Sequence, residues 1–231
     1  MPLQLLELCG TDPARRFSPS CWRSRMALAH KGLDAEVVPW RFTENATLAA
    51  LGGKTVPILV DGEAILTDSW DIALHLDQLY PDAPALFQGP PETYRFIAAW
   101  TDHVLSACVV RLIVSDILPL LGETARIYFS ESREKRFGMP LDQVTAGREA
   151  RLPEFRGLLA PLRRTLGQQA FLGGALPDYA DYIVFGSFMW ARVVSPLRLL
   201  EADDPIEAWR GRMLDLFDGL ARQTPALELA A

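Results

Sequence analysis

The spacing of apolar and polar residues changes several times within the first eighty positions, and each spacing predicts one structural element. Residues 3–8 form a short apolar run typical of a buried strand, and residues 35–40 predict a second strand. Between them, residues 21–31 place apolar side chains on one helical face and end at Gly32, a common residue after a helix. Residues 41–53 are weakly patterned and are expected to hold a short helix. The chain is therefore expected to open with a β-α-β unit.

A tight hairpin follows, because Asp61-Gly62 lies between two apolar runs. Pro57 opens the first of these runs, and its lack of an N–H predicts free backbone groups at a strand edge. Residues 69–79 predict a helix that Asp68 caps. The buried stripe of this helix is expected to consist of Ile72, Ala73, Leu76 and Leu79. A free strand edge beside capping groups suits a small, peptide-like, charged ligand.

The composition changes at residues 80–91, where four prolines and a glycine indicate a linker. Beyond it, almost every segment has helical spacing. The expected helices cover residues 92–118, 151–169, 178–195 and 205–222, and residues 124–138 are expected to form a helix or an ordered loop. We therefore expect an α/β domain over residues 1–80, a linker over residues 81–91 and an all-helical domain over residues 92–231.

Composition and charge narrow the class of protein. With 49% hydrophobic residues and six Trp among 231 residues, the chain can fill a sizeable core. Its net charge is −6, shared evenly between residues 1–80 and the rest, which argues against a nucleic-acid partner. Glu7 comes too early for a signal peptide, and no uninterrupted apolar run is long enough to span a membrane. We expect a soluble, cytoplasmic protein without a membrane partner.

The cysteines and histidines do not indicate a disulfide framework or a metal site. Cys9, Cys21 and Cys108 are widely spaced, which is typical of reduced thiols. The three histidines are too scattered to suggest metal binding, so no metal is expected. Cys21 lies at the start of a predicted helix, where the pKa of a thiol is commonly lowered, and a redox role there stays open.

Several motifs in register resemble those of the cytosolic glutathione S-transferases. The order of the elements, Val56-Pro57 and Asp68-Ser69 match that family, as does the helical second domain. Residues 171–181 resemble its C-terminal helix-capping motif, with Asp178 in place of the usual Ser or Thr cap and Asp181 three residues later. The resemblance covers essentially the whole chain. It implies a thioredoxin-like α/β domain followed by an all-α domain.

Two further segments indicate a branch of that family. Residues 17–28 resemble its serine-type members, and residues 128–138 resemble the bacterial β-etherase-like and fungal FuA-like subgroup. The resemblance implies a homodimeric transferase with glutathione as co-substrate. Its thiolate would attack a hydrophobic electrophile or cleave an aryl ether. A thiol-disulfide reductase working through Cys21 and a non-catalytic glutathione-binding module stay open as alternatives.

Ser18 is the candidate catalytic residue. The pKa of a free thiol is near 8.5, so only about a few per cent of glutathione is ionised at neutral pH, and the protein must stabilise the thiolate. Ser18 immediately precedes the first predicted helix, where a hydroxyl, exposed amides and the helix dipole all favour an anion. Taken without the family motif, Ser18 would be a plain turn or helix-cap residue.

The rest of the predicted glutathione site is assigned by the same resemblance. Val56-Pro57 is implied to be a cis peptide, and Val56 would offer its backbone to the cysteinyl unit as an added strand does. Asp68 would bind the γ-glutamyl ammonium, and Ser69 would bind the neighbouring carboxylate. The glycyl carboxylate would pair with Lys54 or Arg41.

The electrophile is expected in an apolar, aromatic slot between the first helix and the long helix after the linker. Its candidate lining residues are Phe17, Trp22, Tyr94, Trp100 and His103. Two of these, Trp22 and Trp100, fit the core better than a ligand contact when they are taken alone. The charged segment 124–138 is predicted to be a solvated face.

Overall fold

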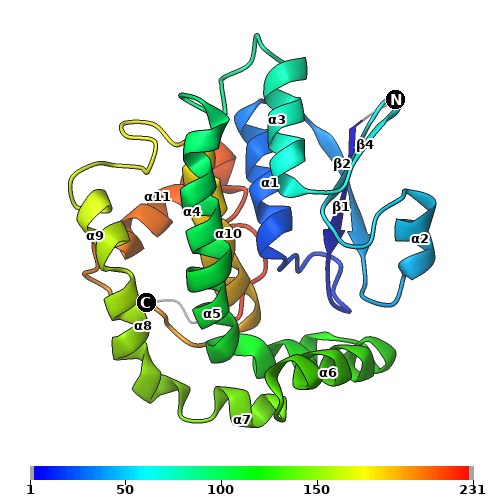
Figure 1. The fold of residues 1–231 in the computed structure, drawn as a ribbon, viewed down its shortest axis with the longest axis vertical. Coiled ribbons are helices and arrows are strands. Elements are labelled where there is room, and N and C mark those ends of the chain that lie inside the picture. The colour runs from blue at the N-terminus through cyan, green and yellow to red at the C-terminus, as the bar shows by residue number, and fades with distance from the viewer. Residues whose placement is uncertain (1–2, 229–231) are drawn as a thin grey trace.

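The computed structural model describes residues 3–228 and shows an α/β part beside a helical part (Figure 1). The first part contains β1 Leu3–Leu8, α1 Pro19–His30, β2 Ala35–Trp40, α2 Asn45–Ala50, β3 Ile58–Asp61, β4 Ala64–Leu66 and α3 Ser69–Leu79. Its sheet has the strand order β2-β1-β3-β4, with β1 and β2 parallel and the other neighbours antiparallel. This thioredoxin-like arrangement and the helices that follow it confirm the predicted fold class.

The hairpin and α3 form for the local reasons that the sequence suggests. Asp61 pairs with Ala64 across the turn, and Gly62 at its tip has a φ of +61°, which glycine adopts without strain. Three members of the predicted stripe on α3, Ile72, Ala73 and Leu76, are fully buried. Leu79 is instead 53% exposed, so its prediction was wrong. It is the last residue of the helix, and the packed surface does not extend that far.

The second part is built of helices. A continuous helical stretch comprises η1 Pro91–Tyr94, α4 Arg95–Trp100, η2 Thr101–Leu105, α5 Ser106–Ile113 and η3 Val114–Leu120, with η2 a π-helical turn. It is followed by α6 Glu123–Phe137, α7 Leu141–Thr145, η4 Arg148–Arg151, α8 Leu152–Leu158, α9 Ala160–Leu166, α10 Tyr179–Val194 and α11 Pro205–Gly219.

Some helix boundaries differ from the predictions. The short helix α7 was not predicted. The single helix expected over residues 151–169 is divided into α8 and α9 near Leu159. Pro153 and Pro161 lie in the first turns of these two helices, where the missing N–H of proline has no intrahelical partner to lose. The end of α11 is kinked, because residues 216–218 leave helical geometry.

The stretch Pro91–Leu120 is long and apolar enough to cross a membrane by length and composition alone. The sequence expectation concerned uninterrupted apolar runs and is not contradicted, because Asp102, Arg111 and Asp116 interrupt this stretch. Within the fold, however, α4 and α5 of this stretch both pack against α10. The core helix of a soluble protein has the same length and composition, so these two properties do not identify a membrane span.

The start of α10 carries the predicted capping motif. Asp178 caps the helix, and Asp181 accepts a hydrogen bond from the Asp178 N–H, which completes a capping box. The Asp181 carboxylate is fully buried and also accepts from the Leu172 and Gly173 N–H groups and from the Trp209 indole. Burial raises the pKa of Asp181, and these donors act in the opposite direction. The capping motif that the resemblance implies is confirmed.

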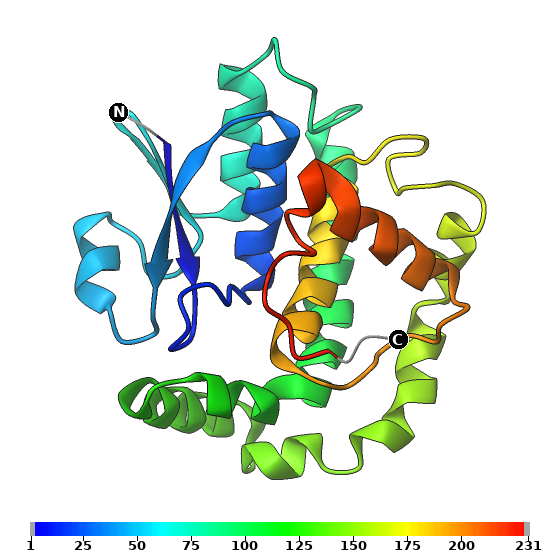
Figure 2. The ribbon, with the colours of Figure 1, turned by 180° about the vertical axis from the view of Figure 1, so that it is seen from behind.

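Direct packing of α1 on α10 joins the two parts of the molecule (Figure 2). Gly186 of α10 approaches α1 so closely that a Cβ there would lie 2.3 Å from the Pro19 carbonyl oxygen. Near the start of α3, the Tyr179 hydroxyl donates to the Ser69 carbonyl at 2.6 Å. The helical part therefore supports the first turns of both α1 and α3.

Candidate functional site

Ser18 lies directly before α1 and is 9% exposed. Its Oγ accepts a hydrogen bond from the Cys21 N–H at 3.3 Å, so the side chain caps the helix. This bond uses an oxygen lone pair and leaves the hydroxyl hydrogen available to a second partner. The N-terminal end of α1 adds the positive end of a helix dipole. Ser18 can therefore donate to an anion that approaches the first turn.

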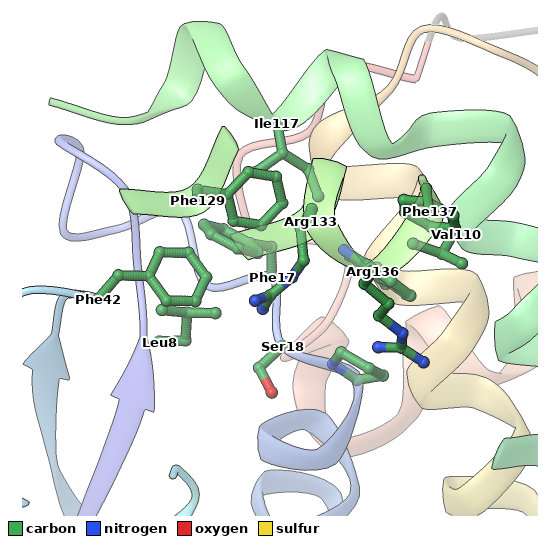
Figure 3. A pocket seen from close by; sticks show the side chains of 12 residues that line it. Leu8, Phe17, Ser18, Phe42, Val110, Ile117, Phe129, Arg133, Arg136 and Phe137 are labelled. Atoms are coloured by element: carbon green, nitrogen blue, oxygen red, sulfur yellow. The ribbon is translucent and has the colours of Figure 1, made fainter. Parts of the chain in front are cut away.

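A cavity of about 210 Å³ opens beside Ser18 (Figure 3). Its twelve lining residues are Leu8, Phe17, Ser18, Pro19, Phe42, Val110, Ile117, Phe129, Arg133, Arg136, Phe137 and Trp190. Most of the wall is aromatic or aliphatic, and the charged groups are two arginines. None of the lining residues, which all lie within the described range 3–228, is acidic. The cavity suits an aromatic ligand beside an anion.

Both parts of the molecule contribute to this cavity, and α6 supplies the outer wall. The aromatic rings of Phe42, after β2, and Phe129, on α6, lie 5.4 Å apart between centroids, and Phe17 lies 6.4 Å from Phe42. These contacts bring α6 against the end of the sheet where β1 and β2 finish (Figure 1). The loop before α1, the loop after β2 and α6 meet at this cavity, and Val110, Ile117 and Trp190 complete its wall.

The predicted glutathione-binding residues lie at the starts of α1 and α3 and before β3. Asp68 caps α3 by accepting from the Trp70 N–H at 2.8 Å, and Ser69 is buried. The Val56–Pro57 peptide is cis, as the resemblance implies. Within residues 3–228, the backbone of Val56 belongs to no strand and has no hydrogen bond to another backbone group.

The directions of the two helices suit an anionic ligand. α1 and α3 pack side by side and run in the same direction, so their N-terminal ends point the same way (Figures 1 and 2). Two positive helix ends on one side of the domain favour negative charge there. Lys54 is exposed and available to solvent ligands, whereas Arg41 already pairs with Glu44 at 3.0 Å.

Among the residues predicted to bind the electrophile, only Phe17 lines the cavity beside Ser18. Trp22 is a core residue whose indole donates to the Arg16 carbonyl at 3.0 Å. The Tyr94 hydroxyl donates to Asp178 at 2.6 Å. It lies well before Val110, which is the first residue of the stretch Pro91–Leu120 to line the cavity.

Trp100 and His103 also lie away from this cavity. Trp100 lines a separate hollow with Phe96 and Leu162, and His103 is exposed. The reason is the position of the crossing: the stretch Pro91–Leu120 meets the cavity only through Val110 and Ile117 in its second half. The expected slot is therefore displaced toward α6.

The segment predicted to be a solvated face supplies the residues that the sequence reasoning missed. Phe129, Arg133, Arg136 and Phe137 of α6 line the cavity, so the prediction of a wholly solvated face was wrong. Their spacing of four, three and one residues places them on one helical face, and the periodicity could have indicated this. Phe42 carried no comparable signal, because it follows a strand in a weakly patterned loop.

Cys21 does not meet the requirements for a reactive thiol. It is fully buried, and burial, together with the negative charge of Glu7, raises its pKa to about 12. The thiol is therefore protonated and inaccessible, despite its place at the start of a helix. The helix dipole was expected to lower this pKa, but the loss of solvent is the larger effect.

Comparison with known families gives two matches that together span most of the chain. Residues 14–85 match the family described as "Glutathione S-transferase, N-terminal domain". Residues 94–220 match "Glutathione S-transferase, C-terminal domain".

Two named relatives are similar in sequence. "Glutathione S-transferase Z1" of Arabidopsis thaliana is 40% identical over 78 residues, covering 29% of this chain and 35% of that protein, so the match spans about a third of the relative. "Glutathione S-transferase-like protein ustS" of Aspergillus flavus is 27% identical over 227 residues, covering 82% of this chain and 80% of that protein.

Solved structures of fungal glutathione transferases share the fold. GSTFuA3 from Phanerochaete chrysosporium has a TM-score of 0.77 at 22% identity, with 100% of this chain and 99% of that chain covered. CsGST63524 of Ceriporiopsis subvermispora, solved in complex with glutathione, has a TM-score of 0.78 at 21% identity, with 94% and 97% covered.

Proposed function

Because the chain belongs to the glutathione S-transferase family, we propose that it transfers the glutathione thiolate to a hydrophobic electrophile and that Ser18 stabilises the thiolate. One observation carries this proposal. The Ser18 hydroxyl accepts from the Cys21 N–H and retains its hydrogen, and Ser18 lines an apolar cavity at the positive end of α1. Serine acts here as a hydrogen-bond donor and not as a nucleophile.

The energy required of the site is moderate. Lowering the pKa of the glutathione thiol by about two units corresponds to roughly 2.7 kcal/mol. A hydroxyl donor, exposed amides of the first turn and the helix dipole together supply contributions of this order. The thiolate then forms by loss of its proton to solvent, and the site holds the anion ready for attack.

The remainder of glutathione is bound by polar groups around that thiolate in this proposal. The free backbone of Val56 pairs with the cysteinyl unit, and Asp68 binds the γ-glutamyl ammonium. Ser69 and the first amides of α3 bind its carboxylate. Lys54 is preferred over Arg41 for the glycyl carboxylate, because Glu44 already neutralises Arg41. The complex of the Ceriporiopsis relative with glutathione supports this tripeptide as the co-substrate.

The electrophile occupies the aromatic cavity between Ser18 and α6. Attack by the thiolate forms a C–S bond and expels the leaving group with its electron pair. For an aryl ether, the leaving group is a phenolate that takes a proton from solvent. The cavity walls of Phe17, Phe42 and Phe129 would hold the aromatic ring.

Substitution of Ser18 tests the catalytic role. We expect Ser18→Ala to lower kcat/KM with 1-chloro-2,4-dinitrobenzene by about tenfold or more, because one donor to the developing charge is lost. The pH profile of kcat/KM should also move to higher pH, since the pKa of the bound thiol rises. Ser20→Ala is the matched control: the same hydroxyl is removed two residues later, outside the cavity lining. An unchanged rate in Ser18→Ala would remove Ser18 from the mechanism.

The alternatives separate in simple assays. A reductase working through Cys21 is disfavoured by the burial and raised pKa of that thiol, and it requires a mixed disulfide visible by intact mass. Glutathione binding without turnover across a panel of electrophiles would indicate a non-catalytic module. Membership of the family also leads us to propose that the protein is cytoplasmic and forms a homodimer. Light scattering on the purified protein would test the homodimer.

A further inference from the structure

The positive charge in the aromatic cavity has no paired carboxylate among the residues that the structure describes. Arg133 is half-buried on α6, with its guanidinium 4.9 Å from the Phe129 ring centroid and 5.9 Å from that of Phe42. The Arg133 guanidinium donates a hydrogen bond to the Ser132 hydroxyl at 2.6 Å. Among residues 3–228, no carboxylate pairs with Arg133 or with Arg136, which lines the same cavity.

Other partly buried arginines of this chain are treated differently. Arg23 pairs with Asp102 at 2.5 Å, Arg163 with Asp204 at 2.8 Å, and Arg210 with Glu228 at 2.6 Å. Where no acid forms an ion pair with the guanidinium, as at Arg192, the guanidinium donates to backbone carbonyls. Arg133 has neither kind of partner in the described chain, although a partly desolvated charge is costly when it is left unpaired.

Because the Arg133 charge has no such partner, the cavity favours an incoming anion. Tyr128 raises the pKa of the Arg133 guanidinium, but burial, the largest influence, and the nearby positive charge of Arg136 both lower it. An anionic group between the two side chains would relieve both effects. Figure 3 shows the two guanidinium groups on the Ser18 side of the cavity, with the Phe129 ring beside Arg133. The arrangement offers aromatic contact and a charge partner in one site.

We propose that the electrophile of this enzyme is an aromatic compound bearing a carboxylate, and that Arg133 and Arg136 bind that carboxylate. The inference rests on the proposed transferase function and names its substrate class. A planar guanidinium can donate two parallel hydrogen bonds to a carboxylate, so Arg133 fixes orientation as well as charge. The reaction itself is unchanged: the C–S bond forms, the leaving group departs with its electron pair, and no further reactant is needed.

Two electrophiles of nearly the same shape provide the test. 1-Chloro-2,4-dinitrobenzene is neutral, and 4-chloro-3,5-dinitrobenzoate carries a carboxylate on a similarly activated ring. We expect Arg133→Gln to lose about tenfold more kcat/KM on the benzoate than on the neutral compound, with the change mainly in KM for the benzoate. Arg136→Gln should show a smaller loss of the same kind. Arg133→Lys should retain part of the preference, since it keeps the charge without the fork.

Lys135→Gln is the matched control. It removes one positive charge from the same helix, but Lys135 is exposed and does not line the cavity. We expect it to leave the ratio of the two kcat/KM values within about twofold of the original protein. Equal losses on both electrophiles in Arg133→Gln would overturn the proposal and assign Arg133 to packing. A raised KM for glutathione, with the ratio unchanged, would assign Arg133 to the tripeptide and also overturn it.

Binding of the two reaction products separates this inference from the proposed function. Calorimetry can compare the glutathione conjugates of the two electrophiles without any turnover. A preference of about tenfold for the carboxylated conjugate, lost in Arg133→Gln, supports the inference even if the rates are low. Equal affinities overturn the inference alone. Failure to bind glutathione and both conjugates would overturn the proposed function together with it.

Discussion

The starts of α1 and α10 are both capped by a side chain, yet they differ in how completely their polar groups are satisfied. At α10, the buried Asp181 carboxylate accepts from three backbone N–H groups and from the Trp209 indole. At α1, Ser18 accepts one long hydrogen bond and keeps its own hydrogen. The well hydrogen-bonded start of α10 stabilises the fold, whereas the start of α1, where Ser18 keeps a free hydroxyl hydrogen, is open to a ligand.

The largest expected effect follows from removing the buried Asp181 carboxylate at the start of α10. In Asp181→Ala, several buried donors lose their acceptor, and we expect the free energy of unfolding to fall by about 3 kcal/mol or more. Urea denaturation followed by tryptophan fluorescence measures this. Asp203→Ala, at an exposed acid, should change the free energy of unfolding by less than about 0.5 kcal/mol. Similar losses in the two variants would contradict a special role for the buried carboxylate.

The contact between the two helices should be nearly as sensitive. A Cβ in Gly186→Ala would lie 2.3 Å from the Pro19 carbonyl oxygen, so α1 must move away from α10. We expect a loss of about 1–3 kcal/mol in the free energy of unfolding and a reduced kcat, because Ser18 moves with Pro19. Gly157→Ala on α8, where a Cβ meets no neighbour, is the control and should stabilise slightly. A fully active, equally stable Gly186→Ala would show that this contact does not position Ser18.

Removal of the Ser18 cap should affect activity strongly and stability little, whereas Asp181→Ala is expected to affect stability strongly. We expect Ser18→Ala to cost about 1 kcal/mol or less in the free energy of unfolding, since the bond to the Cys21 N–H is long. The same variant is expected to lose most of its transferase activity. Measuring both quantities on one preparation separates stability from chemistry. A large loss of stability in Ser18→Ala would place this residue with the structural caps.

The smallest expected effect lies at the other end of α1. His30 contacts the Tyr182 hydroxyl at 2.6 Å, and burial lowers the pKa of its imidazole. The neutral imidazole therefore stabilises the fold above the unfolded-state pKa of about 6.5, and this contribution is lost as pH falls through the lower folded-state pKa. In His30→Gln, the free energy of unfolding should depend less on pH between about 7.5 and 5. The exposed His103→Gln is the control, and parallel curves for His30→Gln and the original protein would contradict the prediction.

Several elements in both parts of the molecule were predictable because their signals are local. The hairpin at Asp61-Gly62, the cap at Asp68 and the capping box at Asp178 each depend on a few neighbouring residues. Ser18 was also predictable as a candidate, since its place before Pro19 and α1 is a sequence motif. The sequence was enough for these features because backbone geometry and capping act over a few positions.

The walls of the cavity could not be predicted in the same way. Leu8, Phe42, Phe129 and Trp190 are distant in sequence and meet only when α6 packs beside the sheet. For the same reason, Tyr94, Trp100 and His103 had suitable chemistry but lie away from the cavity. Cys21 occupies the position that favours a low pKa, yet burial reverses the effect.

The order of neighbouring residues in the sequence therefore determined which helices and caps this chain forms. The tertiary structure decided which of their side chains share one cavity. A hydrogen-bonded turn is specified by adjacent residues, whereas burial and charge balance depend on whatever the rest of the chain places nearby. The unpaired charge of Arg133 illustrates this: its sequence neighbours are strongly charged, but none of them faces into the cavity except Arg136.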